Sequence, residues 1–229
     1  SIAYLGWTVL AQQMIDSGAV TLLAGKGVTP DRLIATPTPF NTAFWRVIAI
    51  DGPAGSGKST VARAVADRLE LEYLDTGAMY RGVAHAVLRR GIAPTDRAAV
   101  AEVARVVSLD VTRSSCLVDG EDASVAIRGP EVTGAVSAVA ANPDVRVEMV
   151  ARQREWVAEL GGGVMEGRDI GSVVFPDARA RFYLTASAEA RVRRRVSQLE
   201  AGGAPVDPAA VAAEIEHRDG IDASRAISP

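Results

Sequence analysis

The chain has 229 residues, of which 48% are hydrophobic, and this size and composition suit one globular domain with a short appendage. The formal net charge of −3 provides no broad basic field, so no nucleic-acid polymer is expected as a partner. The single cysteine, Cys116, excludes an internal disulfide and fits the reducing cytoplasm, and no apolar run is long enough to span a membrane.

Residues 1–45 differ from the rest of the chain and are interpreted as an N-terminal extension. Residues 3–23 suit one or two helices, and two prolines, Pro37 and Pro39, then favour an extended linker. We find no candidate site residue in this segment. We interpret it as a tail or as the remnant of a fused neighbouring domain.

The main domain, residues 46–229, opens with a strand, a glycine-rich turn and a helix. Residues 47–50 form an unbroken apolar run, typical of a strand buried on both faces. Residues 52–57 form the turn, and residues 59–69 carry an apolar stripe that predicts a helix.

The next elements along the chain are a second strand at residues 73–74 and two helices. Thr76 is suited to cap the first of these helices, and the second covers about residues 97–107. Residues 108–128 then change in texture, because short β-rich runs flank an Asp-Gly pair, which is a hairpin signal. This texture predicts a small antiparallel insertion.

Helices and strands alternate again in the last part of the chain. Pro130 opens one helix, and residues 143–160 form a long second one. Strands are predicted at residues 164–169 and 180–185, followed by an arginine-rich helix, a lid at about residues 190–208 and a last helix. This alternation indicates an α/β fold in which a parallel sheet carries helices on both faces.

A P-loop pattern, Gly52-x4-Gly57-Lys58-Ser59, stands between the first predicted strand and its helix. Backbone N–H groups of such a loop and the positive end of the next helix surround a phosphate chain. Lys58 reaches the β- and γ-phosphates, and the Ser59 hydroxyl is the expected ligand of Mg²⁺. The predicted site for ATP with Mg²⁺ comprises nine consecutive residues: Gly52, Pro53, Ala54, Gly55, Ser56, Gly57, Lys58, Ser59 and Thr60.

Two other classes of P-loop protein are excluded. A GTPase normally reads guanine with an Asn-Lys-x-Asp motif, but the only lysines are Lys26 and Lys58, and neither follows an asparagine. A large motor ATPase needs a longer chain. Phosphoryl transfer to an acceptor molecule is favoured instead.

Charged residues at the carboxyl edge of the predicted sheet indicate the acceptor side. The stretch Asp75–Arg81 follows the second strand and offers three candidate substrate-binding residues, Thr76, Tyr80 and Arg81. Arg81 is suited to clamp an anionic acceptor, because ligands bind at that edge of an open sheet. Arg168 and Asp169 leave a buried strand at the same edge, where charges without a purpose would be costly. A purely structural ion pair between Arg168 and Asp169 is the alternative.

The last two predicted helices carry further arginines. Arg191, Arg194 and Arg195 stand at i, i+3 and i+4 and share one helical face, where their mutual repulsion favours a bound anion. Arg193 is expected to point elsewhere, into water. Three more charged residues share a face if the last helix continues through Gly220: Arg218, Asp222 and Arg225. They are interpreted as a binding site, and a surface ion pair is the alternative.

Five stretches, in this order, resemble the bacterial cytidylate kinases, which are P-loop nucleoside monophosphate kinases: IAIDGPAGSGKST, YLDTGAMYRGV, GEDASVAIRGPEVT, EGRDIGSVVFPDA and HRDGIDASRAISP. The resemblance covers about residues 47–229. It implies transfer of the γ-phosphate of ATP to CMP or dCMP in pyrimidine metabolism, by a cytoplasmic protein that is expected to be a monomer. It also implies a β-rich insertion in the monophosphate-binding region, which matches residues 108–128.

The resemblance implies roles for single residues. For the acceptor phosphate it implies Arg81 and Arg168, and for the cytosine base it implies Arg128 with Asp169. It implies Arg218 and Asp222 for the ribose, and Arg225 for a further phosphate contact. It also implies that the arginines of the lid are Arg191, Arg194 and Arg195. Cytosine has an amino donor where uracil has a carbonyl, so Asp169 predicts a preference for CMP over UMP of ~1–3 kcal/mol.

No general base is expected, because the acceptor is a phosphate oxygen that is already anionic. The two histidines, His85 and His217, are therefore expected to have no catalytic role. Catalysis is expected from alignment and charge neutralisation by Mg²⁺, Lys58 and the arginines.

The chain departs from the family at both ends. Residues 1–45 are additional, and the chain stops at Pro229, where the family continues into a final strand and helix, so we expect a C-terminally truncated domain. Two alternatives stay open: a kinase of another small acceptor, such as UMP, AMP or shikimate, or an inactive nucleotide-binding fragment. Shikimate would need a carboxylate clamp instead of a base-reading insertion.

Overall fold

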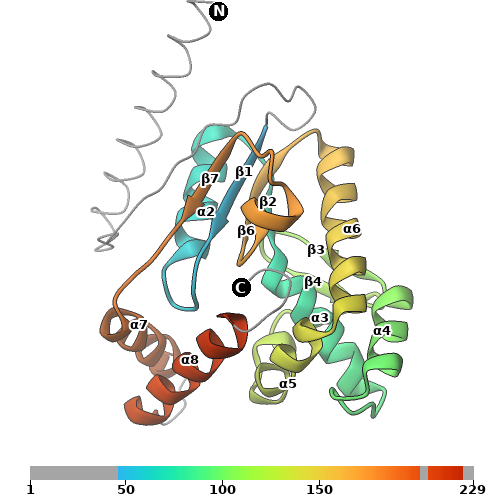
Figure 1. Ribbon diagram of the computed structural model, residues 1–229, viewed down its shortest axis with the longest axis vertical. Coiled ribbons are helices and arrows are strands. Elements are labelled where there is room, and N and C mark those ends of the chain that lie inside the picture. Colours follow the sequence, from blue (N-terminus) through green and yellow to red (C-terminus); the bar gives the residue numbers. More distant parts are fainter. Residues whose placement is uncertain (1–45, 202–205, 224–229) are drawn as a thin grey trace, which may run out of the picture.

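A parallel sheet of four strands forms the centre of the computed structural model, which describes residues 46–201 and 206–223 (Figure 1). The strand β1 lies between two parallel neighbours and is buried at all five residues, which explains its unbroken apolar run. The predicted α/β fold is confirmed. In spatial order the strands are β2 (Tyr73–Asp75), β6 (Gly163–Gly167), β1 (Val47–Asp51) and β7 (Ala180–Tyr183).

Helices cover both faces of the sheet (Figure 1). On one face, the apolar stripe of α2 (Lys58–Leu69) packs against Ile48 and Ile50 of β1. Val47 and Ala49 point to the other face, because successive side chains of a strand alternate in direction. They belong to a larger core that includes residues of four helices: α3 (Thr76–Arg89), α4 (Arg97–Val106), α5 (Pro130–Ala141) and α6 (Pro143–Leu160).

The predicted antiparallel insertion is confirmed as a separate three-stranded sheet with a short helix after it. At its Asp-Gly turn both residues have positive φ, 51° at Asp119 and 82° at Gly120, as a tight hairpin requires. The insertion packs closely on α3, because a Cβ atom at Gly82 would lie 2.8 Å from Leu109 Cδ2. Its elements are β3 (Leu109–Val111), β4 (Cys116–Val118), β5 (Glu121–Asp122) and η1 (Ala126–Arg128).

The start of α3 differs from the prediction. The expected cap, Thr76, is wrong: the Asp75 carboxylate accepts a hydrogen bond from the N–H of Ala78 (3.0 Å), and Thr76 is the first helical residue. The Thr76 hydroxyl donates instead to the backbone carbonyl of Glu166 (2.7 Å). Thr76 therefore ties the start of α3 to the end of β6, and both lie at the carboxyl edge of the sheet.

Two helices, α7 (Ala188–Ala201) and α8 (Pro208–Ala223), pack against each other beyond the carboxyl ends of the strands (Figure 1). The backbone of α8 stays helical through Gly220 as far as Ala223, as the predicted alignment of Arg218 with Asp222 requires, and Arg225 lies outside the described residues. None of the described helices is long and apolar enough to cross a membrane.

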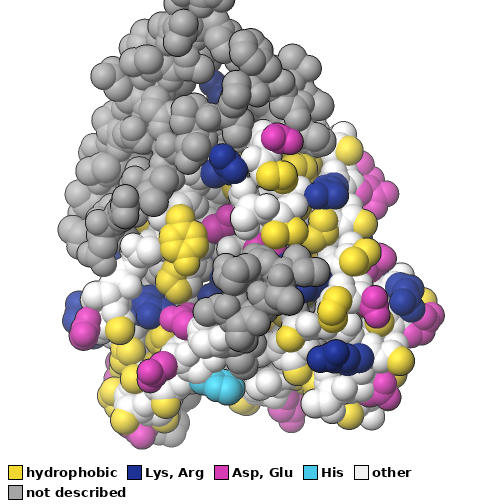
Figure 2. Space-filling model, viewed as in Figure 1, with side chains coloured by type: hydrophobic (Ala, Val, Ile, Leu, Met, Phe, Trp, Pro, Cys, Tyr) yellow, Lys and Arg dark blue, Asp and Glu magenta, His cyan; other side chains and the backbone are white. Residues whose placement is uncertain are grey.

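Acidic and basic side chains are interspersed over the visible face of α4 and α6 (Figure 2). Ion pairs within these helices include the exposed pair of Arg105 and Glu102 (2.8 Å) and the half-buried pair of Arg152 and Glu148 (2.7 Å). Exposed pairs of this kind contribute little to stability, typically below ~1 kcal/mol. Their mixture leaves this face without a strong field of one sign.

Candidate active site

The glycine-rich loop after β1 has the conformation that a phosphate cradle requires. Gly52, Gly55 and Gly57 have positive φ angles of 146°, 74° and 97°. A Cβ atom at Gly52 would collide with the carbonyl oxygen of Leu184, so only glycine fits there. Gly57 also caps α2, whose first N–H groups lack partners within the helix and can therefore bind an anion.

Lys58 folds back over this loop. Its Nζ atom donates a hydrogen bond to the carbonyl oxygen of Pro53 (2.8 Å). Burial, together with the nearby Arg168 guanidinium, lowers the pKa of Lys58 to about 8, although Glu166 and Asp51 act in the opposite direction. Two cations are therefore held close together beside the loop, and a phosphate anion would stabilise both.

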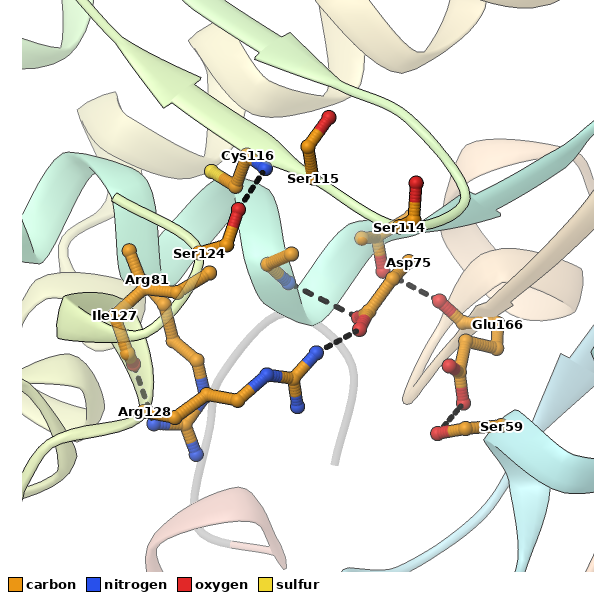
Figure 3. Close-up of polar contacts among 12 residues, drawn as sticks. Ser59, Asp75, Arg81, Ser114, Ser115, Cys116, Ser124, Ile127, Arg128 and Glu166 are labelled. Carbon is orange, nitrogen blue, oxygen red and sulfur yellow. Dashed lines mark hydrogen bonds and ion pairs between the residues drawn. The ribbon is translucent and has the colours of Figure 1, made fainter. Parts of the chain in front are cut away.

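A carboxylate that the sequence prediction missed stands next to Ser59 (Figure 3). Ser59 Oγ donates to Glu166 Oε2 (2.9 Å). The Tyr73 hydroxyl donates to the other carboxylate oxygen. Burial and the neighbouring Asp75 raise the pKa of Glu166. Hydroxyl and carboxylate oxygens suit Mg²⁺, which usually takes one or two protein oxygens beside phosphates and waters, so Ser59 and Glu166 fit the ion expected with ATP.

A second buried carboxylate, Asp51, ends β1. Its two oxygens accept hydrogen bonds from the N–H groups of Ile170 (2.9 Å) and Gly171 (2.8 Å). Burial raises the pKa of Asp51 to about 6, although these hydrogen bonds lower it. Asp51 therefore fixes the helical turn η2 (Ile170–Val174), which directly follows the predicted acceptor residue Asp169.

One cleft of about 1480 Å³ brings the donor and acceptor sides together. Arg81, Arg168 and Arg194 come from distant parts of the chain and converge here on the loop that carries Lys58. Fourteen predicted site residues line the cleft: Ala54, Gly55, Gly57, Lys58, Ser59, Thr60, Thr76, Tyr80, Arg81, Arg128, Arg168, Asp169, Arg194 and Arg195.

The acceptor-side arginines contact the insertion and its surroundings (Figure 3). Arg81 Nη1 donates to the carbonyl oxygen of Ile127 (3.2 Å). It also donates to Thr133 Oγ1 (3.1 Å). The Arg128 side chain is largely exposed, and its guanidinium lies 3.8 Å from the Asp75 carboxylate. Arg128 therefore faces the start of α3.

Asp169 pairs with Arg146 of α6, whereas Arg128, which was predicted to read the base together with Asp169, lies beside Asp75. Arg146 Nη2 donates to Asp169 Oδ2, and the two side chains are only 7% and 9% exposed. Both residues line the cleft, and within the described chain Arg146 Nε is buried without a hydrogen-bond partner. The attraction within a buried ion pair rarely outweighs the cost of removing both charges from water. The position of this pair in the wall of a cleft therefore favours a role in ligand recognition.

Helix α7 supplies two cleft arginines that were predicted and one that was not. Arg194 Nη1 donates to the carbonyl oxygens of Gly55 (3.2 Å) and Ser56 (3.1 Å), so it holds α7 against the P-loop. Arg195 lines the cleft as well. Arg193 also lines the cleft, and it is exposed to solvent, as expected.

Arg191 was expected to share this role but turns to α8 instead. Its guanidinium pairs with the Asp219 carboxylate, which also lies 3.8 Å from Arg168. Three predicted residues of the C-terminal region have side chains outside the described part of the chain, so their ribose and phosphate contacts stay predictions: Arg218, Asp222 and Arg225.

Known proteins are similar to this chain over most of its length. The family model of cytidylate kinase matches residues 48–229. A cytidylate kinase of Nocardia farcinica is 51% identical over 187 residues, which cover 80% of this chain and 81% of that protein. A cytidylate kinase of Mycobacterium leprae is 51% identical over 183 residues, with 80% and 82% covered.

A further relative is longer. It is a bifunctional pantoate ligase/cytidylate kinase of a Synechococcus species, 45% identical in an alignment of 237 positions that covers 99% of this chain and 42% of that protein. Because the family model spans most of the chain and close relatives are about half identical, the chain belongs to the cytidylate kinase family.

Proposed function

We propose that this protein transfers the γ-phosphate of ATP to CMP or dCMP, which gives ADP with CDP or dCDP. Membership of the cytidylate kinase family supports this activity. The observation that carries the proposal is the single cleft that joins the Lys58 loop to Arg81 and Arg168. A donor triphosphate and an acceptor monophosphate bound there would meet among fixed cations.

The donor side binds and orients ATP. The N–H groups of the P-loop and Lys58 hold the phosphates, and Lys58 is already kept in place by its bond to Pro53. Ser59, bonded to Glu166, would hold Mg²⁺, which neutralises phosphate charge when it is bound. The Tyr73 hydroxyl fixes the Glu166 carboxylate from its other side.

The acceptor side holds CMP at both ends. Arg81 and Arg168 bind the phosphate, because both line the cleft and present guanidinium donors. We assign recognition of the base to Asp169 and Arg146 in place of Asp169 and Arg128. The carboxylate of Asp169 accepts from the amino group of cytosine, and Arg146 Nε, buried and still unbonded among the described residues, offers a donor to the ring acceptors.

Transfer then proceeds without a general base. An oxygen of the CMP phosphate, already anionic, attacks the γ-phosphorus, the bond from this phosphorus to the β–γ bridging oxygen breaks, and ADP leaves with the electron pair. Arg194 and Arg195 neutralise the group in transit, and α7 shields the cleft from water. Neither His85 nor His217 lines the cleft.

A coupled assay with ATP, Mg²⁺ and one acceptor at a time tests the proposal. The acceptors are CMP, dCMP, UMP, AMP and shikimate, and we expect the highest kcat/KM with CMP or dCMP. Best turnover of UMP, AMP or shikimate would identify a kinase of another small acceptor. Binding of ATP and CMP without turnover would identify an inactive nucleotide-binding fragment.

We also propose that residues 1–45 are a unit separate from the kinase domain. The family model begins at Ile48, whereas the alignment with the Synechococcus protein covers 99% of the chain and so includes nearly all of this segment. The segment is thus related to part of a protein whose name joins a pantoate ligase to a cytidylate kinase. Removing residues 1–45 should leave kcat/KM for CMP unchanged, and a large loss would assign the segment to the kinase domain.

A further inference from the structure

Asp219 of α8 lies between two arginines that come from different parts of the chain. Its Oδ2 accepts a hydrogen bond from Arg191 Nη1 of α7, and its Oδ1 lies 3.8 Å from Nη1 of Arg168, which follows β6. The side chain of Arg191 is 13% exposed, and those of Asp219 and Arg168 are 28% and 27% exposed. One carboxylate therefore links α7 to an arginine that follows β6 and lines the cleft.

The bonding of this carboxylate is incomplete. Asp219 Oδ1 is buried and has no hydrogen-bond partner within the described part of the chain, and the same holds for Arg191 Nε. At 3.8 Å, the contact of Oδ1 with Arg168 is an attraction between charges without a hydrogen bond. A buried donor and a buried acceptor left unbonded carry a desolvation cost that a better partner would remove.

Arg168 lies where nucleotide phosphates are expected. It lines the cleft, and its charge contributes to the lowered pKa of Lys58, so these two cations stand close to each other. A phosphate group presents more negative charge and more acceptor oxygens to a guanidinium than one carboxylate does. Phosphates in the cleft would therefore compete with Asp219 for the same arginine.

We propose that Asp219 is an internal counter-ion of Arg168 and Arg191, and that Arg168, which lines the cleft, exchanges this carboxylate for nucleotide phosphates when substrates bind. The inference rests on the proposed function, because ATP and CMP supply the phosphates. Asp219 is a positioning residue: it keeps both guanidiniums aligned and neutralised in the free protein. Because it must be displaced, it also weakens nucleotide binding and so favours product release.

Replacing Asp219 by asparagine tests the exchange, because Asp219→Asn removes the charge and keeps the size of the side chain. We expect the Kd of Mg-ADP and the Kd of CMP, each measured by calorimetry, to fall roughly threefold to tenfold. The ligand-free variant should melt at a lower temperature than the parent chain, because two arginines lose their counter-ion. The rise in Tm on adding nucleotide should nevertheless be larger, and KM should fall without a rise in kcat.

Two further variants make the test specific. Glu216→Gln removes the same charge one turn earlier on α8, from an exposed side chain, and should leave both Kd values and the Tm unchanged. Asp219→Ser removes the charge with a smaller side chain and replaces Asp219→Asn if that variant does not fold. Unchanged or weaker nucleotide binding in the variants of Asp219 would overturn the proposal, because the carboxylate would then support the arginines in the bound state.

The two ligands separate this inference from the proposed function. Mg-ADP binding depends on the P-loop and not on the identity of the acceptor. A parent chain that binds Mg-ADP but not CMP would contradict the proposed acceptor. A weaker affinity for Mg-ADP in Asp219→Asn, with normal CMP binding and transfer in the parent chain, would contradict the counter-ion role alone.

Discussion

At the scale of single residues, the site depends on charges that stand where buried strands end. Sequence motifs identified Arg168 and Asp169 but missed Glu166 and Arg146. The reason is physical, because the partner that gives such a charge its meaning is distant in the sequence: 107 residues separate Ser59 from Glu166, and 23 separate Arg146 from Asp169. Periodicity shows that a position is buried, but it does not show which charge it will meet.

Asp51 predicts a specific pH dependence of stability. Its pKa is about 6 in the folded protein against an ordinary 3.8, so between these values the folded state holds a proton that the unfolded state has lost. The contribution of Asp51 to stability is therefore largest at low pH and declines as the pH rises through this window. The decline is at most about 3 kcal/mol, at ~1.4 kcal/mol for each pH unit.

Urea unfolding of the parent chain and of Asp51→Asn, between about pH 4 and pH 7, measures this decline. The asparagine does not titrate, so the free energy of unfolding of the parent relative to the variant should fall as the pH rises. A difference that is independent of pH would contradict the raised pKa of Asp51.

The pair of Asp169 and Arg146 predicts selectivity for the base. In the parent chain kcat/KM for CMP should exceed that for UMP by a ratio that corresponds to ~1–3 kcal/mol. Asp169→Asn should lose most of this ratio, because an amide can donate to the carbonyl that uracil carries in place of the amine. Thermal melting must accompany the kinetics, because Arg146 would be left buried without its counter-ion. Equal kcat/KM values in the parent would contradict the assignment.

At the scale of elements, local signals were sufficient for most of the fold. The apolar run of β1, the prolines that open α5 and α6, and the Asp-Gly turn between β4 and β5 each describe a preference of the backbone itself. The predicted cap residue of α3 was wrong because two neighbouring residues, Asp75 and Thr76, can both cap a helix. Contact with β6 decided between them, since it occupies the Thr76 hydroxyl.

Two glycines, one tightly packed and one exposed, are expected to respond in opposite ways to replacement by alanine. A Cβ atom at Gly163 would lie 2.5 Å from the Trp156 ring and 3.1 Å from the carbonyl oxygen of Glu72, and neither can yield easily. Gly163→Ala should therefore lower the free energy of unfolding by about 1–3 kcal/mol. Gly134 of α5 is exposed with open space at the same position, so Gly134→Ala should raise it by about 0.5–1 kcal/mol. Urea unfolding measures both, and effects of equal sign would contradict the packing described here.

At the scale of the whole molecule, Arg81, Arg168 and Arg194 meet as predicted. The rule that ligands bind at the carboxyl edge of a parallel sheet predicted the place of Arg81 and Arg168, and helical spacing with the family resemblance added Arg194. The same rule does not predict which arginine remains in the cleft and which is neutralised within the protein. Arg191 differs from Arg194 only by one turn of α7, and its pairing with Asp219 depends on how α7 and α8 pack. Packing of two helices is a tertiary property that helical spacing alone does not contain.

Two nucleotide sites within one cleft predict that either can be removed without the other. Lys58→Ala removes the cation over the P-loop, so Mg-ADP should no longer raise the Tm while CMP still does, and transfer should fall by at least about 100-fold. Arg81→Ala should show the reverse pattern, because Arg81 lies on the acceptor side.

A ligand at 100 times its Kd stabilises the folded protein by about 2.7 kcal/mol, which raises the Tm by several degrees. Thermal melting of each variant with each nucleotide resolves the four cases. Loss of both responses in one variant would mean that donor and acceptor share a single phosphate site.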